Sequence, residues 1–287
     1  MDFTPDEIMV VCIARQLCDG ETVAQGIATP LVASAFLLAR YTHAPDLYFA
    51  SAIGQGLCRQ PAPLSLLNVE SLWLDLGLNH AGFARAVADV LPSLKPKEFF
   101  RPAQVDLYGN YNNIAFGSNY THPRLRLPGS GGIPDVSTFN DETYLYVPRH
   151  SRVTFVPELD FRSGLGNHLA RTHGSGPKYL ISDLGQFDFL GQEEERDLLG
   201  RFRLISRHPG VSIDQIKAKT GFPVIIPDPR SETEPPSSEE LKILRQDIDP
   251  LGIRRLELLG GSERRSLLHQ IIQSESSVPH LVQGVPA

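Results

Sequence analysis

The chain has 287 residues, of which 41% are hydrophobic and 21% are charged, a composition typical of a globular protein with one large or two small cores. Its formal net charge is -6 and its lysines and arginines are spread along the sequence, which excludes a strongly basic surface and argues against a nucleic-acid partner. No apolar stretch reaches the roughly 18 to 20 residues of a membrane-spanning helix, so no membrane association is expected.

The cysteines and histidines indicate neither a disulfide framework nor a metal site. Cys12, Cys18 and Cys58 are odd in number and lack CxxC spacing, and the nine histidines lack the spacing of metal ligands. The first seven residues carry acidic side chains where a secretory signal would be basic. We therefore expect reduced thiols, no metal and a cytoplasmic protein.

The first part of the chain alternates helix and strand. Thr4, Pro5 and Glu7 predict a capped helix that runs to about Leu17. A strand over 22–27, a helix over 30–41 and a strand over 47–51 follow. Because the strands are apolar, this order is typical of a parallel sheet covered on both faces.

Further along, the pattern predicts more elements of the same kind. They are helices over 79–90, 212–219 and 239–247, with Ser237 or Ser238 capping the last, and strands over 98–105, 143–147, 153–156, 179–182 and 202–206. A stretch over 227–238 rich in proline, serine and glutamate is expected to be a surface connection. We predict an α/β fold with an open, mostly parallel sheet flanked by helices, one domain over 1–250, and a C-terminal helical extension over 251–287 whose tail is loose after Gln273.

Gln104 to Asn112 leaves a predicted strand through a polar turn. Open α/β sheets bind ligands at the ends of their strands, so this turn is a candidate binding segment. The alternative is a plain turn held by an Asx-type hydrogen bond from a side chain.

A glycine-rich loop runs from Pro128 to Asp135. Three glycines and a serine let successive backbone N–H groups approach a ligand and form an anion or oxyanion site. The loop matches neither the Walker pattern nor the GxGxxG pattern of nucleotide-binding proteins. The alternative is a flexible loop without a ligand.

Together these segments resemble the B subunit of the glutaconate CoA-transferase family. Gln104 to Asn112 resembles the family's Gln-Val-Asp…Gly-Asn motif, and Gly129 to Asp135 resembles its Gly-x-Gly-Gly-x-x-Asp loop. Residues 181–188 are similar to its late strand and hairpin, and residues 208–223 to its C-terminal helix. The resemblance covers about residues 6 to 250.

The resemblance implies a CoA-transferase fold of the NagB/RpiA-like kind and a homologous A subunit as partner, in a heterodimer or an α2β2 heterotetramer. It implies an acyl-CoA substrate and no cofactor beyond the coenzyme A of that substrate. Gly131 and Gly132 would then donate backbone N–H groups to the thioester oxygen. Gln104, Asn110 and Asp135 would organise or line the site, and Ser51, Gly54, Gly129 and Ser130 would bind substrate or CoA.

Transferring members of the family use a glutamate as nucleophile, and in this chain the corresponding position falls on Ala52. A methyl group cannot capture an acyl group. Cys58 is the nearest other nucleophile, but only Arg59 is adjacent to lower its pKa, and most lone cysteines are buried apolar side chains. The position of Ala52 is therefore a vacant nucleophile position.

A site that polarises the thioester without covalent capture favours reactions through an enolate. We expect decarboxylation of an unsaturated dicarboxylic acyl-CoA, because the chain is closest in character to the B subunit of the myxobacterial 3-methylglutaconyl-CoA decarboxylase, which has a cysteine at the position of Ala52. The alternatives are hydrolytic ring cleavage of a cyclic oxo-acyl-CoA, transfer of CoA between carboxylic acids, and a non-catalytic role in stabilising the A subunit.

Overall fold

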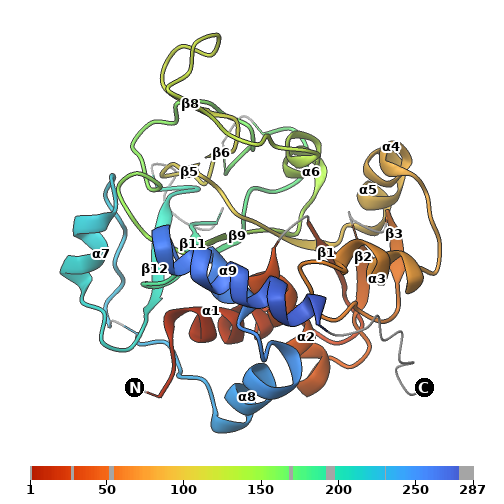
Figure 1. The fold of residues 1–287 in the computed structure, drawn as a ribbon. Helices are drawn as coiled ribbons and strands as arrows, with labels where there is room; N and C mark the ends of the chain where they lie inside the picture. The colour runs from red at the N-terminus through yellow and green to blue at the C-terminus, as the bar shows by residue number, and fades with distance from the viewer. Residues whose placement is uncertain are drawn as a thin grey trace.

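The computed structural model describes residues 2–26, 29–51, 55–167, 171–191, 198–229 and 231–277. Within them, eight strands form one sheet in the order β12-β11-β10-β9-β4-β1-β2-β3 (Figure 1). The five central strands, from β10 to β2, pair in parallel, whereas β3, β11 and β12 pair antiparallel at the two edges. The predicted α/β fold with a mostly parallel sheet is confirmed.

The strands of the large sheet are β1 (Thr22–Gln25), β2 (Tyr48–Ser51), β3 (Gly56–Cys58), β4 (Lys97–Phe100), β9 (Thr143–Val147), β10 (Tyr179–Ser182), β11 (Gly185–Phe189) and β12 (Phe202–Arg207). Two small antiparallel pairs consist of β5 (Gln104–Val105) with β6 (Tyr111–Asn112) and β7 (Ala115–Phe116) with β8 (Leu125–Arg126). The helices are α1 (Pro5–Ala14), α2 (Pro30–Thr42), α3 (Val69–Asp75), α4 (Phe83–Arg85), η1 (Ala86–Val90), α5 (Leu91–Leu94), α6 (Ile133–Phe139), α7 (Ile213–Lys219), α8 (Ser238–Lys242), η2 (Ile243–Ile248), η3 (Ile253–Glu257) and α9 (Gly261–Ser276).

The sheet has a hydrophobic core on each face, because alternate side chains of its strands point to opposite sides. On β4, Phe99 faces the core formed with α1 and α2, and Phe100 faces the core formed with α6 and α7. Figure 1 shows α1, α2 and α8 on one side of the sheet and the small strand pairs with α6 on the other. The central strands are thus buried on both faces, as their apolar sequences predict.

Two predicted ends are wrong by about three residues. The first helix ends at Ala14 and not near Leu17, and α9 runs to Ser276, past Gln273, after which the tail was expected to be loose.

Three other predicted elements also differ from the structure. The helix expected from Asn79 begins at Phe83, because the Asn79 side chain accepts the backbone N–H of Leu57 at 2.8 Å and holds this stretch against β3. The strand expected over 98–105 is divided into β4 and β5, with Pro102 between them, a residue that cannot donate to a strand ladder. Residues 153–156 contribute only an isolated bridge between Phe155 and Val105.

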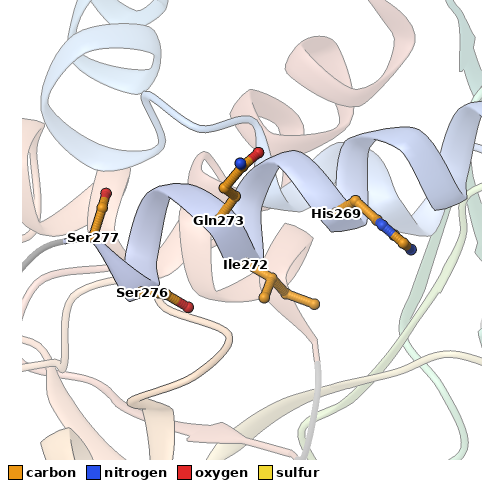
Figure 2. Close-up of a pocket in the computed structure, with 5 residues that line it drawn as sticks. All are labelled: His269, Ile272, Gln273, Ser276 and Ser277. Atoms are coloured by element: carbon orange, nitrogen blue, oxygen red, sulfur yellow. The ribbon is translucent and has the colours of Figure 1, made fainter.

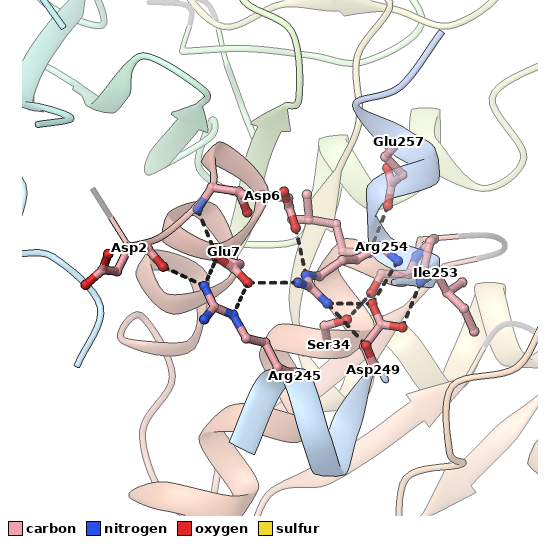
Figure 3. A network of polar contacts seen from close by, with 12 residues as sticks. Asp2, Asp6, Glu7, Ser34, Arg245, Asp249, Ile253, Arg254 and Glu257 are labelled. Atoms are coloured by element: carbon pink, nitrogen blue, oxygen red, sulfur yellow. Dashed lines mark hydrogen bonds and ion pairs between the residues drawn. The ribbon is translucent and has the colours of Figure 1, made fainter. Parts of the chain in front are cut away.

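The segment after residue 240 is joined to α1 by a buried ionic network (Figure 3). The Arg254 guanidinium lies 2.8 Å from both Asp6 and Asp249 and 3.2 Å from Glu7, all four side chains being nearly inaccessible to solvent. Burial alone would raise the pKa of Glu7, but hydrogen bonds from Arg245 and Thr4 lower that pKa to about 2. Glu7 therefore caps α1 and binds the C-terminal part of the chain at the same time.

Among the described residues, no helix is long and apolar enough to cross a membrane. Within the same ranges, no group of three or more histidine, cysteine, aspartate or glutamate side chains is arranged to hold a metal ion.

Candidate functional site

The carboxyl ends of the parallel strands β1, β2, β4 and β9 lie at the same end of the sheet. Open α/β folds bind their ligands at the carboxyl ends of the strands. Ser51 is the last residue of β2 and is paired in register with Gln25, the last residue of β1. Both side chains are buried. Ala52 and Gly54, two of the residues that the sequence predicts for the site, lie outside the described residues. Ser51, which the sequence predicts to bind substrate, is thus buried at the end of a central strand.

A pocket of about 620 Å³ lies where β4 and β9 end, and we call it the arginine pocket. Its wall includes Arg101, directly after β4, Arg149, two residues after β9, and Arg264 from α9. Arg101 forms an ion pair of 3.1 Å with the buried carboxylate of Glu257. In the part of the chain that the structure describes, Arg149 and Arg264 form no close ion pair, although Arg149 is near enough to Asp183 to act on the pKa of that carboxyl group, which burial raises.

The glycine-rich loop borders this pocket. Gly129 lines it with a φ of 120°, and Gly131 follows with a φ of 53°, both in the left-handed region that favours glycine. Across the described ranges, the N–H groups of Gly131 and Gly132 donate to no protein acceptor, whereas Ser130 uses its carbonyl to accept the N–H of Ile133 at 3.0 Å. A side chain at position 131 would meet no atom within 4 Å. Two N–H donors of the loop are thus unused among the described residues, and there is open space beside Gly131.

A second pocket, of about 430 Å³, lies between α6 and the helix formed by α4, η1 and α5, and we call it the apolar pocket. Its wall is almost entirely apolar, with Asp135 and Asn140 as the polar members. The N–H of Ala81, two residues before α4, donates to the carbonyl of Gln55 at 2.9 Å and so holds this helix beside the β2–β3 hairpin. Since Gly129 and Asp135 line different pockets, the glycine-rich loop lies between the two.

Gln104 and Asn110 are buried and organise the loops rather than line either pocket. Gln104 donates to Asp160 at 3.1 Å and accepts from the Asn112 side chain at 2.7 Å. Asn110 donates to Asp106 at 2.9 Å, and its carbonyl oxygen accepts the N–H of Gly166 at 2.9 Å. The Asx-type turn considered as an alternative is therefore present around Asp106, which also accepts the backbone N–H of Asn110 at 3.0 Å.

Cys58 lies in the hydrophobic core with α1 and α2, and its thiol faces the carbonyl of Trp73 at 3.8 Å. Burial raises the pKa of the Cys58 thiol. A buried thiol with a raised pKa forms little thiolate at neutral pH, so these contacts argue against a nucleophilic role for Cys58.

A buried carboxyl group that the sequence did not single out lies in β4. Glu98 is buried, and burial raises its pKa to about 8. Glu98 Oε2, the Tyr111 hydroxyl and the Thr143 hydroxyl have no hydrogen-bond partner among the described residues. Glu98 and Thr143 are neighbours in register on β4 and β9. Glu98 is thus held as a neutral acid inside the domain at neutral pH.

A further hollow, of about 660 Å³, runs along α9 and is lined by His269, Ile272, Gln273, Ser276 and Ser277 (Figure 2). Figure 2 shows these side chains projecting from one exposed helix in different directions. It contains none of the residues that the sequence predicts for the site and no strongly charged group, so we do not assign a ligand to it.

The sequence reasoning missed the arginine pocket. Arg149 gave a partial signal, because it follows the predicted strand 143–147 after two residues, whereas Arg101 fell inside the strand predicted over 98–105 and gave none. Arg264 gave no comparable signal, since it reaches the pocket from a helix more than a hundred residues further along.

Comparison with known proteins identifies the family of this chain. No protein-family model matches the chain. The B subunit of the 3-oxoadipate CoA-transferase of Pseudomonas knackmussii is 29% identical over 264 residues, which are 85% of this chain and 92% of that protein. The IpdB subunit of the cholesterol ring-cleaving hydrolase of Rhodococcus jostii is 30% identical over 245 residues, 83% of this chain and 89% of that subunit.

Among solved structures, the crystal structure of the decarboxylase AibA/AibB contains a chain 33% identical to this one. The two superpose with a TM-score of 0.75, and the match covers 91% of this chain and 100% of the other. A fold, a glycine-rich loop and relatives of nearly equal length all agree. This chain therefore belongs to the glutaconate CoA-transferase family of enzymes, alongside its B subunits.

Proposed function

We propose that the chain is the B subunit of a heteromeric enzyme, paired with a homologous A subunit, that processes an acyl-CoA thioester without forming a glutamyl-CoA intermediate. The reaction is the decarboxylation of an unsaturated dicarboxylic acyl-CoA. One observation carries this proposal: in the sequence an alanine, Ala52, and not a carboxylate, follows Ser51, the last residue of β2, while the N–H groups of Gly131 and Gly132 are unused among the described residues. The chain thus keeps backbone donors that can polarise the thioester carbonyl but lacks the glutamate that would capture the acyl group.

The proposed step balances without an added oxidant or reductant. The bond between the distal carboxylate and its carbon breaks, carbon dioxide leaves, and the electron pair moves through the conjugated double bond to the thioester oxygen. The resulting dienolate oxygen accepts hydrogen bonds from Gly131 and Gly132, and a proton from water or the A subunit completes an unsaturated monocarboxylic acyl-CoA. One donor of this kind contributes about 3 kcal/mol to a transition state.

The pockets on either side of the glycine-rich loop support an acyl-CoA as the substrate. The apolar pocket offers room for the apolar part of the acyl group. The arginine pocket offers positive charge for an anionic group. The 33% identity to a chain of the decarboxylase AibA/AibB supports the same reaction.

Hydrolytic ring cleavage of a cyclic oxo-acyl-CoA is a second candidate, because the apolar pocket of about 430 Å³ has room for a ring and an IpdB subunit is 30% identical. CoA transfer is the alternative that the similarity to a 3-oxoadipate CoA-transferase supports, and a non-catalytic stabilising role is the alternative of another class.

Mass spectrometry of the products separates these reactions. The chain would be purified with its A subunit and incubated with a panel of dicarboxylic and cyclic oxo-acyl-CoAs in the presence of acetate. We expect loss of carbon dioxide from an unsaturated dicarboxylic acyl-CoA. Addition of water to a ring would establish ring hydrolysis instead, acetyl-CoA would establish CoA transfer, and activity of the A subunit alone would establish the stabilising role.

A further inference from the structure

The arginine pocket brings several positive side chains together in a chain that is negatively charged overall. The whole chain has a net charge of -6, yet three guanidinium groups from distant segments, Arg101, Arg149 and Arg264, line this one pocket. The carboxylate of Glu257 is also engaged by the N–H of Leu31 at 2.9 Å and by the hydroxyl of Tyr146 at 3.0 Å. It therefore compensates Arg101 and not the other two.

The positions of Arg149 and Arg264 are built into the fold. Arg149 follows β9, and its Nη1 would lie only 3.2 Å from a side chain at Gly260, just before α9. Arg264 is in the first turns of α9, where its N–H donates to the Gly260 carbonyl at 3.3 Å. The end of a central strand and the start of α9 thus bring the two guanidinium groups to one wall.

The pocket is within reach of the unused donors of the glycine-rich loop. Gly129 lines the pocket, and two residues span at most about 7 Å, so Gly131 lies within that distance of the pocket wall. In a five-carbon dicarboxylic acyl group, four carbon–carbon bonds separate the two carboxyl carbons, about 5 Å in an extended chain. A ligand whose thioester oxygen is at Gly131 can therefore place an anionic group between the arginines.

We propose that Arg149 and Arg264 form an anion subsite that binds a carboxylate or phosphate group of the acyl-CoA. The planar guanidinium group matches both anions with two parallel hydrogen bonds, and neither arginine forms a close ion pair with a protein carboxylate among the described residues. The subsite rests on the proposed acyl-CoA substrate but not on the reaction that follows binding.

Dissociation constants of three probes test this subsite. The complex with the A subunit would be titrated with glutaryl-CoA, which has both anions, butyryl-CoA, which lacks the distal carboxylate, and glutaryl-pantetheine, which lacks the phosphates. The variants are Arg264→Gln and Arg149→Gln, with Arg265→Gln as the control, because Arg265 is exposed on α9 like Arg264 but does not line the pocket.

If the subsite binds the carboxylate, both pocket variants weaken glutaryl-CoA and glutaryl-pantetheine at least tenfold and leave butyryl-CoA unchanged. If it binds a phosphate, they weaken the two CoA esters and leave glutaryl-pantetheine unchanged. Wild-type affinity for all three probes in both variants would overturn the subsite, as would an equal loss in Arg265→Gln or a wild-type complex that binds no probe. Because binding is measured, a complex that binds in this way but releases no carbon dioxide contradicts only the proposed function.

Discussion

Glu257 accepts the backbone N–H of Leu31 at 2.9 Å, and the same carboxylate forms an ion pair of 3.1 Å with Arg101. One buried residue near the C-terminus thus holds the first turn of α2 and one wall of the arginine pocket. The segment that follows residue 250 is therefore part of the architecture of the site, because α9 contributes Arg264 to the same pocket. A change that destabilises this C-terminal segment should therefore also destabilise the arginine pocket.

Replacement of Arg254 by alanine tests the ionic network that joins this C-terminal segment to α1. Removal of its guanidinium leaves Asp6, Glu7 and Asp249 buried without their shared cation, which costs about 3 to 5 kcal/mol. The free energy of unfolding in urea measures the loss. Arg255→Ala is the matched control, because Arg255 is the exposed neighbour and its replacement should stay within about 0.5 kcal/mol of wild type. A loss in Arg254→Ala no larger than in the control would contradict the role of the network.

The predictability of the fold differed from element to element for physical reasons. β9 and β10 begin and end at the predicted residues, because short apolar runs between turn residues are typical of buried strands. The helix start at Phe83 was missed because the Asn79 side chain bonds to a strand more than twenty residues earlier in the sequence. Such a contact leaves no local pattern.

The site was predictable in part. The glycine-rich loop could be identified from local sequence, because backbone donors need small residues close together. The arginine pocket could not, since its three guanidinium groups come from segments that are adjacent only after the sheet and α9 have formed. Glu98 was missed for a similar reason, because its burial depends on packing on one face of β4 and not on its neighbours in sequence.

The pH dependence of stability should report Glu98. Its pKa is raised from 4.5 to about 8 in the folded chain, so between these values the folded state holds a proton that the unfolded state has released. The stabilisation is therefore complete below about pH 4.5 and is lost as the pH rises to about 8, by about 1.4 kcal/mol per pH unit. Glu98→Gln should remove this loss and be more stable than wild type at pH 8.

Urea unfolding of both proteins at pH 6 and pH 8 measures the effect. Glu70→Gln is the control, because Glu70 is exposed in α3, and it should keep the wild-type dependence on pH. If Glu98→Gln and wild type lose the same stability between these two pH values, Glu98 is not the protonated group.

Thiol labelling should distinguish the three cysteines. Cys12 and Cys58 are buried, and burial raises the pKa of Cys12 to about 12 and also raises that of Cys58, whereas Cys18 is exposed. Iodoacetamide at pH 7.5 should therefore modify Cys18 first, with the buried pair labelled only after unfolding in urea. Peptide mass spectrometry measures the order. Rapid labelling of Cys58 in the folded chain would instead support Cys58 as a nucleophile.

Gly131→Val should abolish most activity without unfolding the chain. A side chain at this position meets open space in the protein, so the fold loses only the cost of a left-handed conformation, about 1 to 2 kcal/mol. A branched side chain beside the Gly131 N–H should hinder the approach of the thioester oxygen, and we expect kcat/KM of the complex to fall by about 100-fold or more.

Gly20→Val is the control for backbone strain, because Gly20 also has a positive φ and open space around it. Gly20 lies just before β1, at the amino ends of the parallel strands and away from the site. Gly20→Val should show a similar loss of stability with nearly normal kcat/KM. Full activity in Gly131→Val would favour the non-catalytic role.

Trapping of the enzyme during turnover tests the central claim most directly. The complex with the A subunit would be incubated with an unsaturated dicarboxylic acyl-CoA, treated with hydroxylamine or borohydride, and analysed by mass spectrometry beside the variant Ala52→Glu. The account predicts carbon dioxide and no modified residue in wild type, with a trapped glutamyl thioester only in the variant. A CoA thioester on any residue of either wild-type subunit would contradict it.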